Sequence, residues 1–178
     1  MTQLHPDLKL PARFLSYRGD LAPTRAKAER DPVSAASKGR WSLRLNSTME
    51  SVGEVEATAE RLATEAGLNE DDLFHVTMAV REATINAVLH GNEYDPTQPI
   101  DVIFENTGDD FIFTVTDQGR GFDPEHLPDP SAPENLLRGT GRGIFLIRSL
   151  MDEVHFRQLH PGTELKLIKH LAPAQGKT

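Results

Sequence analysis

Residues 82–91 read Glu-Ala-Thr-Ile-Asn-Ala-Val-Leu-His-Gly and form the end of a predicted helix. At about 100° per residue, Glu82, Asn86 and His90 fall on one polar stripe. His75, about two turns nearer the start of the helix, falls on the same stripe. Apolar residues border the stripe on both sides. Polar groups held between apolar flanks cost several kcal/mol when they are left unpaired, so the stripe predicts the floor of a ligand pocket.

Two glycine-rich segments follow: 117–123, Asp-Gln-Gly-Arg-Gly-Phe-Asp, and 139–144, Gly-Thr-Gly-Arg-Gly-Ile. Glycine has no Cβ and adopts positive φ easily, so these clusters indicate close backbone approach to a ligand or a tight turn. The first cluster leads into a proline-rich loop and not into a helix, which argues against a Rossmann dinucleotide site. The chain has no G-x-x-x-x-G-K-[ST] run, which excludes a P-loop. Together with the polar stripe, the clusters predict a nucleotide site of another kind.

The composition predicts one domain with a tail. A length of 178 residues allows one substantial core. There is no cysteine, which excludes disulfides, thiolate metal sites and a cysteine nucleophile. No stretch approaches the roughly 20 apolar residues that span a bilayer, and the N-terminus lacks a basic segment followed by an apolar run. We therefore expect a cytoplasmic protein that does not insert into membranes.

The charge is divided unevenly along the chain. Residues 1–40 carry eight Lys and Arg against four Asp and Glu, whereas residues 41–178 carry 11 against 23. An acidic body argues against direct binding of nucleic acid and suits a partner with a basic face. We expect a flexible basic extension over 1–40, a folded domain over 41–171 and a C-terminal tail over 172–178.

The hydrophobic periodicity predicts the order strand, helix, helix, two strands, helix, two strands. Thr77, Arg81 and Thr84 are expected to form the solvent face of the second helix. An irregular loop with four prolines is predicted over 122–137, a length typical of lids or disordered segments. The predicted strands cover 41–45, 100–105, 111–116, 153–158 and 163–171, and the predicted helices cover 49–65, 73–90 and 143–151.

The order of the three motifs resembles that of the GHKL ATPase superfamily, which includes gyrases, histidine kinases and MutL. The motifs are Glu82-x-x-x-Asn86-Ala-x-x-His90, Asp117-x-Gly119-x-Gly121-Phe-Asp, and Gly139-x-Gly141-x-Gly143. Within it, the compact length, the His-Gly after the Asn helix and residues 141–154 are most similar to anti-sigma-factor serine/threonine kinases of the RsbW and SpoIIAB type. The similarity covers residues 41 to about 170. It implies an α+β fold, a two-layer sandwich (the Bergerat fold) whose mixed, mostly antiparallel sheet is covered on one face by helices.

The resemblance also implies roles for the helical stripe. Asn86 would be the protein ligand of Mg²⁺, since magnesium uses few protein groups and the phosphates supply others. Glu82 would accept the proton of the incoming hydroxyl or orient water. The alternatives are a buried Asn that satisfies backbone groups and an ordinary surface Glu. His90 is either a ligand contact or a helix-end histidine favoured by the helix dipole.

The glycine motifs would hold the rest of an ATP molecule. The Asp117 carboxylate would accept a hydrogen bond from the adenine amino group, whereas the guanine carbonyl would oppose it at about 1–3 kcal/mol, so ATP is expected over GTP. Thr163, in the final hairpin, would help to hold the adenine through its hydroxyl. The alternatives are that Asp117 is an ordinary turn aspartate and that Thr163 is an ordinary strand threonine. The second cluster would wrap the triphosphate with backbone N–H groups. Arg138 and Arg142 would either add positive charge near the γ-phosphate or be exposed to solvent without a ligand contact. The implied nucleotide contacts are Asn86, His90, Asp117, Gly119, Gly121, Arg138, Gly139, Thr140, Gly141, Arg142, Gly143 and Thr163.

Three functions are consistent with these residues. The leading one is an ATP- and Mg²⁺-dependent kinase that phosphorylates Ser or Thr of an anti-anti-sigma (STAS) partner and sequesters a sigma factor. The second is a nucleotide-dependent switch that binds ATP and a partner without transfer. The third, a histidine-kinase module, is disfavoured because residues 1–40 are too short and too interrupted by proline for a dimerising helical hairpin. Family members usually dimerise through the sheet edge and first helix, which predicts a homodimer that uses 41–45.

Overall fold

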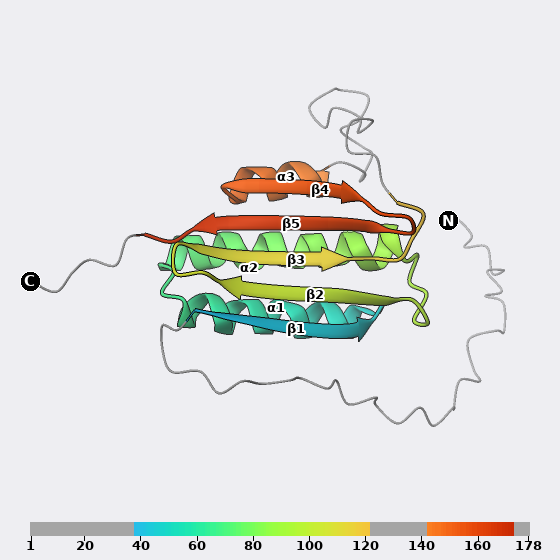
Figure 1. The fold of residues 1–178 in the computed structure, drawn as a ribbon, viewed down its shortest axis with the longest axis horizontal. Coiled ribbons are helices and arrows are strands. Elements are labelled where there is room, and N and C mark those ends of the chain that lie inside the picture. The colour runs from blue at the N-terminus through green and yellow to red at the C-terminus, as the bar shows by residue number, and fades with distance from the viewer. Residues whose placement is uncertain (1–37, 122–141, 173–178) are drawn as a thin grey trace, which may run out of the picture.

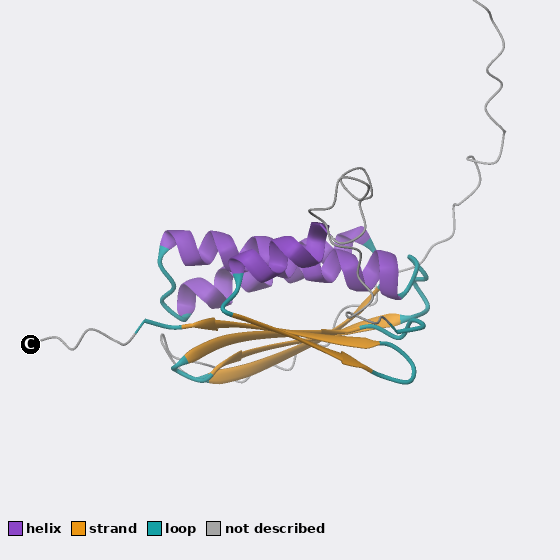
Figure 2. Cartoon of the chain, turned by 90° about the horizontal axis from the view of Figure 1, so that it is seen from above, coloured by secondary structure: helices purple, strands orange, loops and turns teal. Residues whose placement is uncertain are grey.

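The computed structural model describes residues 38–121 and 142–172. The expected loop at 122–137, all but the last three residues of the expected extension, and residues 173–178 lie outside this range. One layer of helices covers one face of a single sheet (Figure 2). The elements are β1 (Gly39–Asn46), α1 (Met49–Glu65), α2 (Glu70–Ile85), η1 (Asn86–Gly91), β2 (Pro99–Asn106), β3 (Asp110–Thr116), α3 (Arg142–Leu150), β4 (Glu153–Gln158) and β5 (Thr163–His170).

The sheet has the strand order β1-β2-β3-β5-β4 (Figure 1). Each of its four strand pairs is antiparallel. The predicted α+β sandwich is confirmed, with the difference that the described strands form a purely antiparallel sheet where a mixed one was expected. The chain crosses from β3 through α3 to the edge strand β4, and β5 then returns into the gap beside β3. This return places the start of β5 beside the end of β3.

Local signals explain where the helices begin. The Thr48 side chain accepts a hydrogen bond from Ser51 N–H at 3.2 Å and caps α1. Asn69 caps α2 in the same way through Asp72 N–H, and the acidic first turn of α2 suits the helix dipole. α1 and β4 have the predicted bounds, and the ends of the other elements differ from the predicted ones by at most three residues, apart from the last turns of α2.

Those last turns widen into a π-helix. Residues 86–91 form η1, and the N–H of Asn92 bonds to the carbonyl of Ala87, five residues earlier. The predicted helix to about His90 is therefore continuous in space but changes its geometry at Asn86. π turns of this kind recur at functional sites.

The core lies between the helix layer and the sheet. Phe104 of β2 and Phe113 of β3 pack with their ring centroids 5.2 Å apart, and both side chains are completely buried. Val52 and Val55 of α1 and Val80 of α2 are buried against this layer. Of the described helices, none is long and apolar enough to span a membrane.

The expected solvent face of α2 was wrong. Thr84 is completely buried, with its hydroxyl donating to the Val80 carbonyl at 2.7 Å. Arg81 pairs with Glu56 of α1. The cause is α1, which packs against α2 and meets it through Arg81. Phe74, nearer the start of α2, is exposed.

We expect Asp152 to stabilise the fold at neutral pH. Burial opposes its ionisation, but hydrogen bonds from His170 N–H at 2.7 Å and from Lys169 at 3.2 Å outweigh burial and lower the pKa of Asp152. A lowered carboxyl pKa contributes stability that is present above the ordinary value of 3.8 and lost as the pH falls through the lowered pKa. Urea unfolding should therefore show Asp152→Asn to be less stable at pH 7 and less sensitive to acid than the wild type.

Asp109→Asn is the matched control, because the Asp109 side chain makes no ion pair with the described residues. The unfolding free energy of Asp109→Asn should stay close to that of the wild type both at pH 7 and in acid. Parallel pH curves for Asp152→Asn and the wild type would contradict the assignment.

Candidate functional site

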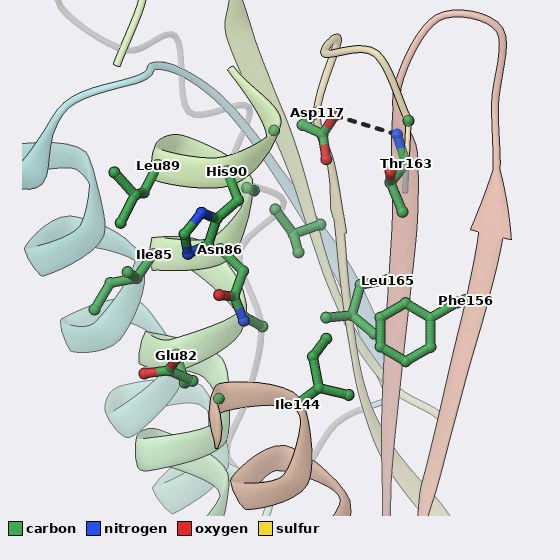
Figure 3. A pocket seen from close by; sticks show the side chains of 16 residues that line it. Glu82, Ile85, Asn86, Leu89, His90, Asp117, Ile144, Phe156, Thr163 and Leu165 are labelled. Carbon is green, nitrogen blue, oxygen red and sulfur yellow. Dashed lines mark hydrogen bonds between the residues drawn. The ribbon is translucent and has the colours of Figure 1, made fainter. Parts of the chain in front are cut away.

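A cavity of about 520 Å³ lies between the helix layer and the sheet, at the end where η1 meets β3 and β5. Its walls come from α2, η1, α3, β3, β4 and β5. Figure 3 shows the Asn86 side chain extending from the helix layer toward the strands that carry Thr163, Leu165 and Phe156, with Asp117 at the end of β3. Seven of the predicted site residues line it: Glu82, Asn86, His90, Asp117, Gly121, Gly143 and Thr163.

The other predicted residues have different positions. Gly119 packs against the Gly91 backbone and does not line the cavity. Arg142 is the exposed first residue of α3 and is also absent from the lining. His75 is half-buried beside Phe74, their ring centroids 6.2 Å apart, so the polar stripe enters the cavity only from Glu82 onward. Arg138, Gly139, Thr140 and Gly141 lie outside the described residues.

The Asp117 carboxyl group is anchored at the end of β3. Its Oδ1 accepts hydrogen bonds from Gly119 N–H at 3.0 Å and Thr163 N–H at 3.2 Å, and the Asp117 N–H donates to the Thr163 carbonyl at 3.0 Å. None of the hydrogen bonds given by the described residues reaches Oδ2, which leaves this oxygen for the cavity. Burial raises the pKa of Asp117, and the two backbone hydrogen bonds partly oppose that rise.

Three glycines allow this anchoring. A Cβ on Gly91 would lie 2.7 Å from the Asp117 Cβ and 2.6 Å from Oδ2. A Cβ on Gly119 would collide with the Gly91 backbone, and one on Gly162 would collide with the Asp117 carbonyl. The backbones of η1, of the segment after β3 and of the β4–β5 turn therefore meet around one carboxylate. Only residues without a Cβ permit so close an approach.

Asn86 supplies the polar group on the opposite wall. It sits where α2 passes into η1, and its Nδ2 is buried without a hydrogen-bond partner among the described residues. Such orphaned polar groups are rare in folded proteins and call for a missing partner. A half-turn of the amide exchanges its oxygen and nitrogen, so this position suits either a hydrogen-bond acceptor or a hard cation. The residues present thus fit a ligand rich in oxygen atoms.

Glu82 lies one turn before Asn86, beside the start of α3. A Cβ on Gly143 would lie 2.9 Å from the Glu82 carboxyl carbon and would overlap its oxygen. Glycine at the second position of α3 therefore leaves room for the carboxylate. The N-terminus of a helix favours negative charge, so this corner suits anionic groups. Among the described residues there is no cluster of three or more His, Asp or Glu that could hold a metal without further ligands.

The remaining walls are apolar and were not predicted. Val115 of β3, Phe156 of β4 and Leu165 of β5 face the cavity from the sheet, and Ile144 of α3 closes it from the helix layer. The alternation of strand residues indicates which side chains face the helices, but not which of them line a hollow. An apolar slot beside a buried carboxylate suits a flat, partly polar ring such as a nucleobase.

The family of the chain follows from a comparison with known sequences. The profile of the histidine kinase-like ATPase domain matches residues 45–169. The chain belongs to this family. Within the family it is RsbW-like, as the motif order indicated. Serine-protein kinase RsbW of Staphylococcus epidermidis is 34% identical over 140 residues, which cover 75% of this chain and 87% of that protein. Serine-protein kinase RsbW of Staphylococcus aureus is 33% identical over the same shares.

A solved structure supports the fold of this histidine kinase-like ATPase domain. The RsbU and RsbW domains of Rv1364c from Mycobacterium tuberculosis match with a TM-score of 0.56 at 22% identity. The match covers 79% of this chain and 35% of that longer chain. At this identity the likeness concerns the arrangement of helices and strands, so the chemistry must be argued from the cavity.

We expect Gly91→Ala to displace the Asp117 side chain. The added methyl group has no room beside the carboxylate, and overpacking of this kind costs about 1–3 kcal/mol. Chemical denaturation should show a loss in that range. Gly53→Ala is the control, because Gly53 lies in α1 with nothing within 4 Å of an added Cβ, and helix propensity predicts a gain of about 0.5–1 kcal/mol there. Equal effects of the two substitutions would contradict the close approach.

Asp117→Asn should stabilise the protein without ligand. The amide oxygen keeps an acceptor for Gly119 and Thr163, while the buried charge is removed. Because the pKa of Asp117 is raised, the penalty for its charge is largest above that pKa and vanishes below the ordinary value of 3.8, so the advantage of Asn should shrink as the pH falls. Asp117→Ala should lose about 1–3 kcal/mol because it leaves two N–H groups unpaired. Urea unfolding from pH 8 to pH 4 checks both, and an unstable Asp117→Asn would contradict the argument.

Proposed function

We propose that this protein binds ATP with Mg²⁺ and transfers the γ-phosphate to a Ser or Thr of an anti-anti-sigma (STAS-domain) partner. In this proposal it also sequesters a sigma factor, and the phosphorylation state of the first partner decides which of the two is held. The single observation that carries it is the buried Asn86 Nδ2, which has no hydrogen-bond partner among the described residues and belongs to a side chain that lines the same cavity as Asp117. The proposal also includes the cytoplasm as the location and a homodimer as the assembly.

Each end of the cavity suits one part of ATP. Asp117 Oδ2, the oxygen left for the cavity, would accept a hydrogen bond from the adenine amino group. The backbone N–H groups that donate to Oδ1 hold the carboxylate in the orientation that this contact needs. Thr163 lies beside this carboxylate and would add a contact to the base. The apolar side chains Val115, Phe156 and Leu165 would cover the faces of the ring.

The other end suits the phosphates. Asn86 would hold Mg²⁺ through its amide oxygen, and the cation, when bound, would neutralise phosphate charge. Glu82 would act as the general base toward the incoming hydroxyl, with the glycine at position 143 leaving it space. His90 at the exposed rim, Arg142 and the N-terminus of α3 would add contacts near the phosphates. Gly121, with φ of 84°, lines the same cavity. The segment 138–141, which lies outside the described residues, belongs to this proposal as a phosphate loop.

The partners suggested by the RsbW relatives suit the surface charge. Residues 41–178 carry 12 more acidic than basic residues, which would favour a partner with a basic face and disfavour direct contact with nucleic acid. Family resemblance supports a STAS-domain substrate. A carboxylate at Glu82 in the cavity supports transfer over mere binding, because binding alone does not need a general base. A switch without transfer is the alternative outcome of the experiment below.

Glu82→Ala should abolish transfer while it retains ATP binding. Loss of a general base lowers the rate about 10²-fold or more, whereas nucleotide affinity depends on other groups. The measurement is phosphoserine or phosphothreonine formation on purified STAS-domain proteins of the source genome, with γ-labelled ATP and Mg²⁺. Calorimetry with ATP serves as the binding control.

Asp117→Ala should lose ATP binding and transfer together, because it removes the adenine contact. ATP binding by the wild type without transfer to any STAS protein would favour the switch. Phosphohistidine as the product would favour the histidine-kinase alternative. Absence of ATP binding in the wild type would refute the proposal altogether.

A further inference from the structure

Asn92 is a buried polar residue next to the cavity that does not line it. It follows η1 directly, and only 1% of its surface is exposed. Its side-chain amide makes four contacts. Nδ2 lies 2.8 Å from Ser47 Oγ and 3.1 Å from each of the carbonyl oxygens of Gln98 and Pro99, and Oδ1 accepts the Gln118 N–H at 2.8 Å.

The two halves of this amide have different partners. The nitrogen faces the framework, where Ser47 joins β1 to α1 and Gln98 and Pro99 lead into β2. The oxygen holds the residue that follows Asp117. The Gln118 N–H belongs to the peptide plane that joins it to Asp117, so a hydrogen bond to it limits rotation of the Asp117 backbone. Asp117 itself therefore sits between an anchor on β5 and an anchor on η1.

We propose that Asn92 is a positioning residue for recognition of the nucleobase: its amide oxygen fixes the Asp117–Gln118 peptide and thereby aims the Asp117 carboxylate into the cavity. This inference rests on the proposed function, in which Asp117 accepts the 6-amino group of adenine. The geometry supports it from a second side, because Gly91, the residue before Asn92, packs against the Asp117 side chain. Residues 91 and 92 thus contact both the side chain of Asp117 and the peptide after it.

Substitutions can separate the two halves of the amide. Asn92→Ala removes both. Asn92→Asp keeps an oxygen that accepts the Gln118 N–H but loses the donor to the framework. Ser47→Ala is the matched control: Ser47 is equally buried, at 1% exposure, and its loss disturbs the same cluster while it leaves the Asn92–Gln118 bond in place. If Asn92 has a purely structural role, the preference for the correct base should fall together with the melting temperature across these variants. If Asn92 positions Asp117, the preference should depend on whether the hydrogen bond to the Gln118 N–H is kept.

The experiment measures calorimetric affinities for ATP and for purine riboside triphosphate, an analogue that lacks the 6-amino group, both with Mg²⁺. The wild type should prefer ATP about tenfold or more, as expected for a hydrogen bond to a charged acceptor. Asn92→Ala should reduce this preference at least about threefold, and Asn92→Asp and Ser47→Ala should keep it within about twofold despite lower melting temperatures. In an Asp117→Asn background, Asn92→Ala should change the preference no further.

Amide hydrogen exchange gives a readout that does not need nucleotide. The Gln118 amide should be protected in the wild type, Ser47→Ala and Asn92→Asp, and exposed in Asn92→Ala. Should Asn92→Ala fail to fold, Asn92→Ser, which withdraws the oxygen from Gln118, takes its place with the same expectations.

Two results overturn the inference alone: undiminished preference for ATP in Asn92→Ala, or an equal loss in Ser47→Ala. A wild type that binds neither nucleotide overturns the proposed function and the inference with it. The two failures are therefore distinguishable.

Discussion

Burial of the Asp117 carboxylate is the constraint on which the architecture of the site depends. A carboxylate in an apolar setting is tolerated only when donors surround it, and here the donors are backbone N–H groups from two different segments. Backbone donors can approach so closely only where glycine replaces a side chain. The glycines at 91, 119 and 162 therefore determine how near η1, the end of β3 and the start of β5 can come to one another.

The widened turn at the end of α2 also contributes to the support of the Asp117 carboxylate. In η1, Gly91 reaches the Asp117 side chain, while Asn86 and His90 line the cavity. Asn92, directly after η1, bonds to Ser47 and to the Gln118 N–H. One short segment thus contributes to the wall of the cavity and to the support of the opposite wall. The helix layer and the sheet are joined at this end by hydrogen bonds and close backbone contacts. Elsewhere they are joined by apolar packing in the core and by the ion pair between Asp72 of α2 and Lys169 of β5.

The family of the chain is established by sequence comparison, whereas its chemistry is a proposal argued from the cavity. Membership of the histidine kinase-like ATPase family rests on the matched profile and on RsbW relatives that share about a third of their residues with this chain. The cavity adds what such likeness alone does not supply. It has a buried carboxylate at one end, apolar walls, and at the other end a second carboxylate and an amide nitrogen without a hydrogen-bond partner among the described residues. These features give each proposed role a residue whose surroundings suit it.

The sequence alone determined the element order, the family and the main polar residues of the cavity, because periodicity, caps and glycine spacing are local properties of the chain. The bounds of α1 and β4 and the alignment of Glu82, Asn86 and His90 on one helix follow from such local rules. Only the tertiary structure decided that Thr84 is buried, that the helix widens at Asn86, and that Phe156 and Leu165 line the same cavity as Asp117. It also decided that Asn92 meets Ser47, 45 residues earlier in the chain. Contacts of this kind depend on how separate elements pack, and no periodicity within one element records them.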